Sequence, residues 1–263
     1  MSYNLHIPHN TGDASKLVST SGDGKYLAGG QSLLPTIRMG LASPSDLVSL
    51  QGMAELAGIK VEGNTITIGA MTTHAAVAAN ADVKRLIPAL AALAGGIGDR
   101  QVRNRGTIGG SLANSDPAAC YPAGVLGLGA TINTDKRKIA GDEFFKGLFE
   151  TALQADELIT SVSFPVPAKA AYMKFKNPAS RFAIVGVMVS QGSAGTRVAV
   201  TGAGACAFRV AAMEAALGNS WNAAALDGMK ASADKLNSDL HASAAYRAHL
   251  IGVMARRAVA AAK

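Results

Sequence analysis

The stretch Thr107-Ile108-Gly109-Gly110-Ser111 and the similar stretch Ala28-Gly29-Gly30-Gln31-Ser32 each carry two adjacent glycines after an apolar segment, followed by a serine. Glycine allows a positive φ and lets a ligand come close to the backbone, because it has no Cβ. Successive N–H groups in such a turn form a concavity suited to an anion, and the serine hydroxyl adds a donor. One glycine pair is more often a simple tight turn. Two similar loops, far apart in sequence, predict two walls that close on one diphosphate.

The composition is that of an ordinary globular protein. The chain has 263 residues, of which 49% are hydrophobic and 16% charged, so it can bury a sizeable core. Its longest apolar runs are shorter than the roughly 18–20 residues that span a bilayer. The first residues lack the charged start and apolar segment of a signal peptide. We therefore expect a cytoplasmic protein.

The reactive side chains do not form a catalytic or metal-binding pattern. Two cysteines, Cys120 and Cys206, are too few for a disulfide framework or for a cysteine-ligated cluster held by this chain alone. His6 and His9 are separated by a proline and do not share a helical face, so we expect no metal site there. No nucleophile is paired with an evident base. This pattern favours a protein that binds a reactive cofactor, with no catalytic residue of its own.

The formal charge of +7 suits an anionic ligand or an acidic partner. Nucleic acid is disfavoured, because the basic residues are dispersed and aromatic residues make up only 5% of the chain.

Periodicity and turn residues predict an α+β protein in three parts: residues 1–56, 57–167 and 168–263. Each of the first two parts is an α/β unit that carries one glycine loop. The third part is a sheet-and-helix domain with three strands around a hairpin at 192–195, closed by alanine-rich helices. One of these helices is expected within 221–235. In the last one, Tyr246, Leu250, Val253 and Met254 fall on one apolar face, which we expect to pack in the core.

A second glycine motif lies near the end of the chain. Residues 202–207 (GAGACA) match the dinucleotide pattern Gly-x-Gly-x-x-Gly/Ala, and Asp227 stands near the distance where an acid would meet the ribose. A Rossmann unit needs a further strand after the helix, whereas this sequence continues as an alanine-rich segment. We therefore interpret the motif as a structural turn.

Three segments together resemble a known family: residues 27–35 (LAGGQSLLP), 68–74 (IGAMTTH) and, most specifically, 97–117 (IGDRQVRNRGTIGGSLANSDP). Over nearly its whole length the chain is similar to the FAD-binding medium subunits of molybdenum hydroxylases, and most of all to the medium chain of aerobic carbon monoxide dehydrogenase. The resemblance implies a two-subdomain FAD-binding fold of the vanillyl-alcohol-oxidase (PCMH) type. It also implies a C-terminal domain, a three-stranded antiparallel sheet with helices, that covers the isoalloxazine ring.

The resemblance also implies which residues bind the cofactor, flavin adenine dinucleotide (FAD). The first loop contributes one wall of the diphosphate site, the second loop the other, and residues between and after the loops lie along the cofactor. A weaker transfer places two side chains of the C-terminal domain near the flavin ring. The full set is Ala28, Gly29, Gly30, Gln31, Ser32, Leu33, Ala70, Thr72, His74, Gly106, Thr107, Gly109, Gly110, Ser111, Asn114, Asp116, Cys120, Tyr172 and Lys174. For His74, a solvent-facing side chain at a helix start is an equally good interpretation.

One position departs from the family. Cys120 stands where relatives usually carry an aspartate that contacts the cofactor. A thiol cannot accept hydrogen bonds as a carboxylate does, so the difference predicts weaker FAD binding or a shifted potential, unless water or Asp116 takes over. Arg100, Arg103 and Arg105, just before the second loop, suit a phosphate, an acidic partner surface or simply solvent.

The function implied by the resemblance is electron transfer. An iron–sulfur small subunit with two [2Fe–2S] clusters and a molybdopterin-containing large subunit would complete a heterotrimer, usually paired into a dimer. FAD would pass the electrons to a quinone, NAD or another acceptor, and the complex could lie on the inner face of the membrane. The alternatives are a stand-alone FAD-dependent oxidase of the same fold and a degenerate subunit that has lost FAD. The substrate of the complex, whether carbon monoxide, an aldehyde or an N-heterocycle, is chosen outside this chain.

Overall fold

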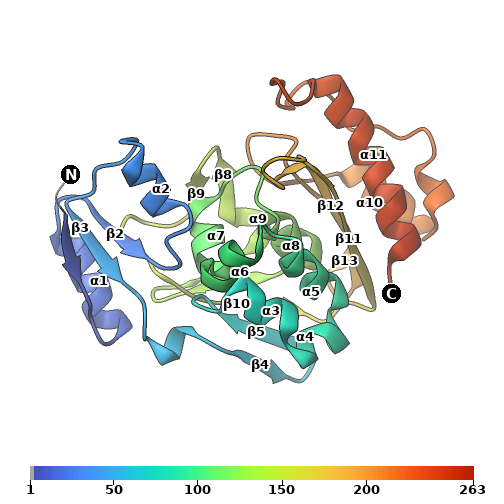
Figure 1. Ribbon diagram of the computed structural model, residues 1–263. Coiled ribbons are helices and arrows are strands. Elements are labelled where there is room, and N and C mark those ends of the chain that lie inside the picture. The colour runs from blue at the N-terminus through green and yellow to red at the C-terminus, as the bar shows by residue number, and fades with distance from the viewer. Residues whose placement is uncertain (1–2) are drawn as a thin grey trace.

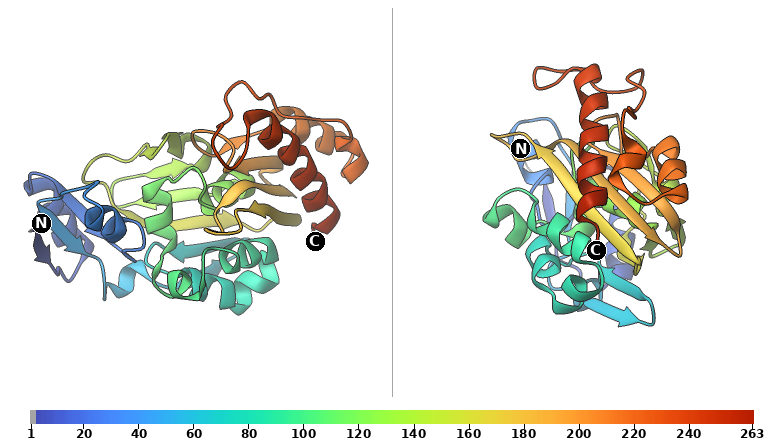
Figure 2. Two further views of the ribbon diagram at one scale, coloured as in Figure 1. Left: turned by 45° about the horizontal axis from the view of Figure 1, so that its top comes forward. Right: turned by 90° about the vertical axis from the view of Figure 1, so that its right-hand side faces the viewer.

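The computed structural model describes residues 3–263, which form three parts arranged in a row (Figure 1). The N-terminal part lies at one end, a larger helix-covered sheet forms the middle, and the C-terminal sheet with its helices lies at the other end. A turned view separates the three parts clearly (Figure 2, left). The mixed helix-and-sheet architecture predicted from the sequence is therefore observed.

The N-terminal part is a three-stranded parallel sheet with the order β1-β3-β2. Its long helix begins after Asn10, whose side chain accepts a hydrogen bond from the Asp13 N–H, and its buried face packs on Val48. The first glycine loop begins where β2 ends, so the sheet fixes its position. The elements are β1 (Asn4–His6), α1 (Thr11–Thr20), β2 (Gly24–Leu27), α2 (Leu33–Arg38), β3 (Asp46–Ser49) and the 3-10 helix η1 (Ala54–Leu56).

The middle part is a five-stranded sheet with the order β4-β5-β10-β6-β7, covered by short helices. Ile66, Ile68, Val162 and Phe164 alternate along β5 and β10 and are fully buried in the largest core cluster. The elements are β4 (Ile59–Glu62), β5 (Thr65–Gly69), α3 (His74–Ala79), α4 (Ala81–Leu86), α5 (Pro88–Gly95), α6 (Arg100–Arg105), α7 (Ile108–Asn114), α8 (Tyr121–Leu128), β6 (Thr131–Thr134), β7 (Lys138–Ala140), α9 (Gly141–Phe144), β8 (Phe145–Gly147), β9 (Glu150–Thr151) and β10 (Ile159–Pro165). The second glycine loop is the start of α7: Thr107 is its N-cap, and residues 108–111 form its first turn.

The C-terminal part is an antiparallel sheet with the order β11-β12-β13-β14. The expected hairpin is confirmed, since Gly192 pairs with Gly195 at its tip. Helix α11 lies on one face of the sheet (Figure 2, right). Helix α8 of the middle part also packs on this sheet, where Gly127 approaches Met188. The elements are β11 (Lys169–Lys176), β12 (Ala183–Gly192), β13 (Gly195–Thr201), β14 (Phe208–Arg209), α10 (Ala211–Asn219), the 3-10 helix η2 (Ala223–Leu226) and α11 (Ala244–Ala261).

Three details of the C-terminal part differ from expectation. The sheet has a fourth strand, β14, which is only two residues long and therefore leaves no alternating pattern in the sequence. Segment 221–235 contains only the short η2, since Gly228 adopts φ +73 and the backbone turns there. Tyr246 does not pack in the core: it is 44% exposed, and its ring meets Phe175 edge-on, whereas Leu250 and Met254 are buried as expected.

The glycines of the 202–207 motif serve the packing of the chain. Gly202 has φ +83, its N–H donates to the Pro117 carbonyl at 2.7 Å, and a Cβ there would overlap the carbonyl oxygen of Ala183. The motif is thus a close backbone crossing between the middle and C-terminal parts, in line with the structural interpretation. Within residues 3–263, no helix is long and apolar enough to cross a membrane.

Candidate functional site

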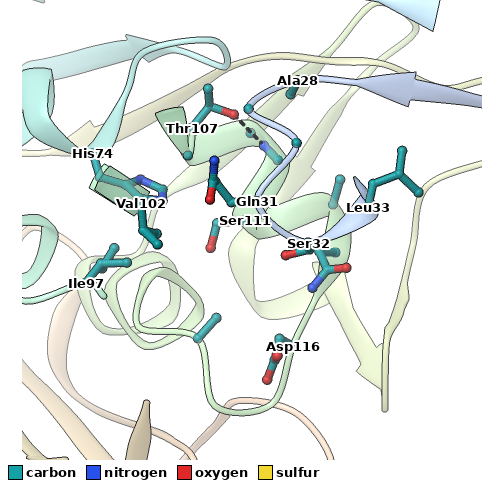
Figure 3. A pocket seen from close by; sticks show the side chains of 18 of the residues that line it. Ala28, Gln31, Ser32, Leu33, His74, Ile97, Val102, Thr107, Ser111 and Asp116 are labelled. Carbon is teal, nitrogen blue, oxygen red and sulfur yellow. Dashed lines mark hydrogen bonds between the residues drawn. The ribbon is translucent and has the colours of Figure 1, made fainter. Parts of the chain in front are cut away.

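A cavity of about 730 Å³ runs between the three parts of the chain, and both glycine loops line it (Figure 3). Of the 19 predicted site residues, 17 line this cavity: Ala28, Gly29, Gly30, Gln31, Ser32, Leu33, Ala70, His74, Gly106, Thr107, Gly109, Gly110, Ser111, Asn114, Asp116, Cys120 and Lys174. The two loops, separated by more than seventy residues of sequence, thus share one site.

Thr72 and Tyr172 do not line the cavity. The Thr72 hydroxyl donates to the Gly58 carbonyl and accepts from the Gly58 N–H, both at 3.0 Å, so it links the segment after β5 to the backbone before β4. The Tyr172 hydroxyl is buried against the backbone of Gly186, which has no room for a Cβ there. These two positions support the wall of the cavity from behind.

The loops touch each other through their backbones. A Cβ at Gly29 would overlap the carbonyl oxygen of Arg105, just before the second loop. A Cβ at Gly110 would lie 3.5 Å from the Cβ of Ala28. Glycine is required at position 29 because the two chains pass so closely there.

The first loop presents unused donors. Within residues 3–263, the backbone N–H groups of Gly30, Gln31, Ser32 and Leu33 have no protein acceptor. Gly30 has φ +72, a left-handed conformation of the kind found in backbone turns that bind anions. The side chains of Gln31 and Ser32 lie at the same cavity (Figure 3). This arrangement suits a diphosphate.

The second loop differs from the first, because its amides are already bonded within the chain. The Gly109 N–H donates to the Ala70 carbonyl at 2.8 Å, the Gly110 N–H to the Thr107 hydroxyl at 3.1 Å, and the Ser111 N–H to the Thr107 carbonyl at 3.0 Å. The expectation of free amides in both loops is therefore wrong for this one. It contributes Thr107, Gly109 and Gly110 to the wall of the cavity, together with Ser111 and Asn114.

His74 is a buried residue that lines the cavity. It is 4% exposed, and its ring centroid is 5.3 Å from that of Tyr121. A Cβ added at Gly106 would lie only 2.6 Å from its Nε2. Its Nδ1 has no partner within residues 3–263. Burial, and then the positive charge of Arg103, lower the pKa of His74 to about 4, so the imidazole is neutral near pH 7. The solvent-facing interpretation is therefore wrong, since the side chain is enclosed.

Lys174 and Cys120 meet at the wall formed by the middle and C-terminal parts. The Lys174 Nζ lies 3.4 Å from the Cys120 Sγ and donates to the carbonyls of Gly96 at 2.7 Å and Arg181 at 3.1 Å. Cys120 is 4% exposed. This wall therefore carries a cation beside a thiol.

Two charged groups near the second loop are held by the backbone. Arg103 donates to the carbonyls of Ile97 and Gly98, so its guanidinium shapes the wall of the cavity. Asp116 accepts from the Ala118 N–H at 2.8 Å, and burial raises the pKa of its carboxyl above the ordinary value. Of the other two arginines, Arg105 lines a smaller cavity of about 300 Å³ behind the first loop.

The cavity lining also includes residues for which the sequence predicted no cofactor contact: Lys25, Tyr26, Gln154, Glu157, Leu158 and Ile159. Glu157 is bound by both the Nε and an Nη of Arg137 at 2.9 Å. Hydrogen bonding to Arg137 is the main cause that lowers the pKa of Glu157 to about 2. Residues 157–159 fit the family resemblance in sequence, although no cofactor contact was predicted for them, and Ile159 begins β10.

The cavity suits an elongated dinucleotide. The free amides of residues 30–33 can bind phosphate, and the lining extends from Lys25 and Tyr26 of the N-terminal part to Lys174 and Phe182 of the C-terminal part. Its volume falls within the usual range of about 300–1,000 Å³ for ligand pockets. FAD, with a flavin and an adenosine on either side of a diphosphate, fits this shape.

Comparison with known families agrees with this interpretation. Residues 1–167 match the FAD binding domain in molybdopterin dehydrogenase, and residues 170–262 match the CO dehydrogenase flavoprotein C-terminal domain. The nicotine 6-hydroxylase medium subunit of Paenarthrobacter nicotinovorans is 35% identical, over 96% of this chain and 94% of that protein. The carbon monoxide dehydrogenase medium chain of Afipia carboxidovorans is 33% identical, over 100% of this chain and 97% of that protein.

Solved structures show the same fold. Carbon monoxide dehydrogenase from Hydrogenophaga pseudoflava, in a form that lacks the Mo-pyranopterin moiety of the molybdenum cofactor, superposes with a TM-score of 0.91 at 33% identity, covering 99% of this chain and 97% of that one. Quinoline 2-oxidoreductase from Pseudomonas putida 86 superposes with a TM-score of 0.84 at 27% identity, covering 99% and 96%. The chain belongs to the FAD-binding subunits of the molybdenum hydroxylases, the family that includes the carbon monoxide dehydrogenase medium chains.

Proposed function

We propose that this chain holds FAD in the cavity between residues 1–56 and 57–167, with residues 168–263 closing over the flavin, and that it transfers electrons within a molybdenum hydroxylase complex. The observation that carries the proposal is the convergence of the two glycine loops on one cavity, whose lining includes residues 30–33 with their unused amides.

The contacts of these residues support a division of roles. The first loop binds the diphosphate through its amides and through Gln31 and Ser32. Ser111 and Asn114 donate from the opposite wall, and the neutral imidazole of His74 lines the site from the side. Lys174 and Cys120 lie at the end that faces the C-terminal part, where the flavin ring belongs. Bound FAD would supply the chemistry, since it accepts electrons singly and releases them as a pair.

The relatives support the proposed partners. Both are medium chains or subunits by name, which implies further chains in their complexes. We infer an iron–sulfur subunit with [2Fe–2S] clusters as the electron donor and a molybdopterin-containing large subunit as the site of substrate oxidation. The heterotrimer would be paired into a dimer, and a quinone or NAD would receive the electrons. We place the complex in the cytoplasm, with possible contact to the inner face of the membrane.

The visible absorption spectrum of the purified chain tests the cofactor assignment. We expect the two-band spectrum of bound flavin, and a colourless protein that takes up no added FAD would refute the proposal. Purification of a tagged chain from its native cells tests the partners. We expect iron–sulfur and molybdopterin subunits to be retained, whereas an active chain without partners would support the stand-alone oxidase.

A further inference from the structure

Lys174 is a cation on the cavity wall and forms no ion pair among the described residues, 3–263. Its Nζ donates to two backbone carbonyls, which are uncharged, and lies beside the Cys120 thiol, which is a weak acceptor. Within residues 3–263, no carboxylate lies within the 4.0 Å of an ion pair with this ammonium. Its positive charge therefore acts on whatever occupies the cavity.

The acidic groups that line the same cavity are engaged elsewhere. Asp99 accepts from the Val102 N–H at the start of α6. Asp116 accepts from the Ala118 N–H, and burial raises its pKa. Glu157 is paired with Arg137 at the end near the N-terminal part. On the wall beside Lys174, Arg181 accepts from Lys174 through its carbonyl and adds positive charge through its guanidinium. Arg103, which donates to the carbonyls of Ile97 and Gly98, adds a further positive charge nearby.

The Cys120 thiol occupies the position from which a carboxylate could neutralise the Lys174 ammonium. Cys120 is 4% exposed and 3.4 Å from the Lys174 Nζ, so a carboxylate at position 120 would form a close ion pair with the ammonium. In a partly enclosed site, such a pair would neutralise much of the charge that the ligand experiences. With cysteine at this position, the charge remains available to the ligand.

We propose that the uncompensated charge of Lys174, maintained by cysteine at position 120, raises the reduction potential of the bound flavin and so directs its electrons to a high-potential acceptor of the quinone class. This inference rests on the proposed function. When the isoalloxazine ring takes up two electrons and one proton, it gains one negative charge. A cation at the ring stabilises that reduced form over the neutral oxidised form. A nicotinamide acceptor then becomes the less favourable outlet.

The test is a redox titration of the full chain loaded with FAD, monitored by flavin absorbance against a reference dye. The informative pair is Cys120→Asp and Cys120→Asn, which introduce side chains of nearly equal size and different charge. At a fixed ambient potential, we expect Cys120→Asp to lower the ratio of reduced to oxidised flavin at least tenfold relative to Cys120→Asn. For a two-electron couple this corresponds to about 30 mV.

A second pair examines the cation itself. We expect Lys174→Gln to lower the same ratio to a similar extent and Lys174→Arg, which retains the charge, to change it less. If Lys174 acted only by joining the C-terminal part to Gly96, then Lys174→Gln would lower the melting temperature without changing the ratio, and the aspartate and asparagine variants would agree with each other. That result would overturn the inference.

The outcome also separates this inference from the proposed function. A wild-type chain that binds no FAD would refute the proposed function, whereas a chain that binds FAD with equal ratios in all variants would refute only the role of Lys174. If one pair fails to fold, the other decides the question. Oxidation of the reduced chain by a soluble quinone at a much higher rate than by NAD would support the acceptor class, and the reverse preference would contradict it.

Discussion

The backbone of Gly29 lies directly against the carbonyl oxygen of Arg105, so closely that a Cβ at position 29 would overlap it. This contact joins the N-terminal part to the segment that leads into the second glycine loop. The two walls of the cavity are thus held at a fixed separation by their backbones.

Gly29→Ala is therefore expected to separate the loops. The overlap with Arg105 forces a backbone shift, which we expect to destabilise the fold by about 1–3 kcal/mol and to release most of the bound FAD. The measurements are the melting temperature and the ratio of flavin to protein after gel filtration. Gly22→Ala is the matched control, because nothing lies within 4 Å of its Cβ position. Full flavin occupancy in Gly29→Ala would contradict the assignment of the loop.

The two glycines of the second loop are expected to differ. A Cβ at Gly109 would lie 2.6 Å from the Cβ of Ala70, whereas one at Gly110 would meet the Thr107 hydroxyl oxygen at 3.0 Å, a contact that a small shift can relieve. We expect Gly109→Ala to lower the melting temperature of the flavin-free chain more than twice as far as Gly110→Ala. The melting temperatures are measured by calorimetry. Equal effects would show that the backbone at Ala70 can shift to admit a Cβ at position 109, which would contradict the prediction.

The buried imidazole of His74 is expected to make stability depend on pH. Its pKa is lowered from 6.5 to about 4 in the folded chain. Between pH 6.5 and pH 4, the unfolded chain therefore binds more protons at this residue than the folded chain does. Stability is therefore lost as the pH falls through this window, by on the order of 3 kcal/mol. The His74→Gln variant should show a flatter profile. The ring-proton shifts of His74 by NMR report the pKa directly, and a titration near 6.5 would contradict the burial.

The ion pair of Glu157 and Arg137 is expected to act at lower pH. The pKa of Glu157 is lowered from 4.5 to about 2, chiefly by hydrogen bonding to Arg137, so its contribution is present above pH 4.5 and lost as the pH falls toward 2. Because Arg137 is about half exposed, we expect Glu157→Gln to cost only on the order of 2 kcal/mol at pH 7. Urea unfolding at pH 7 and pH 3 measures the difference between the variant and the wild type.

Glu143→Gln is the control for this pair, since Glu143 is exposed on α9. Its stability should follow the wild type at both pH values. If Glu157→Gln also did so, the pair would contribute nothing to the cavity wall.

Much of the fold could be predicted from local patterns. The alternation of Ile66 and Ile68, the hairpin between Gly192 and Gly195 and the loops after apolar segments are all properties of neighbouring residues. The two-residue strand β14 and the non-helical segment around Gly228 could not be predicted, because pairing to a distant strand and a positive φ decide them.

The same division applies to the site. The two glycine loops, the family to which they belong and the unusual cysteine at position 120 follow from residue type and order alone. The folded chain was needed to show that, within residues 3–263, the amides of the first loop are free while those of the second are bonded to Ala70 and Thr107. It was also needed to show the Lys174 ammonium beside Cys120 and in no ion pair with a described carboxylate. Hydrogen bonding and charge pairing depend on distances between segments far apart in the chain, and only folding sets those distances.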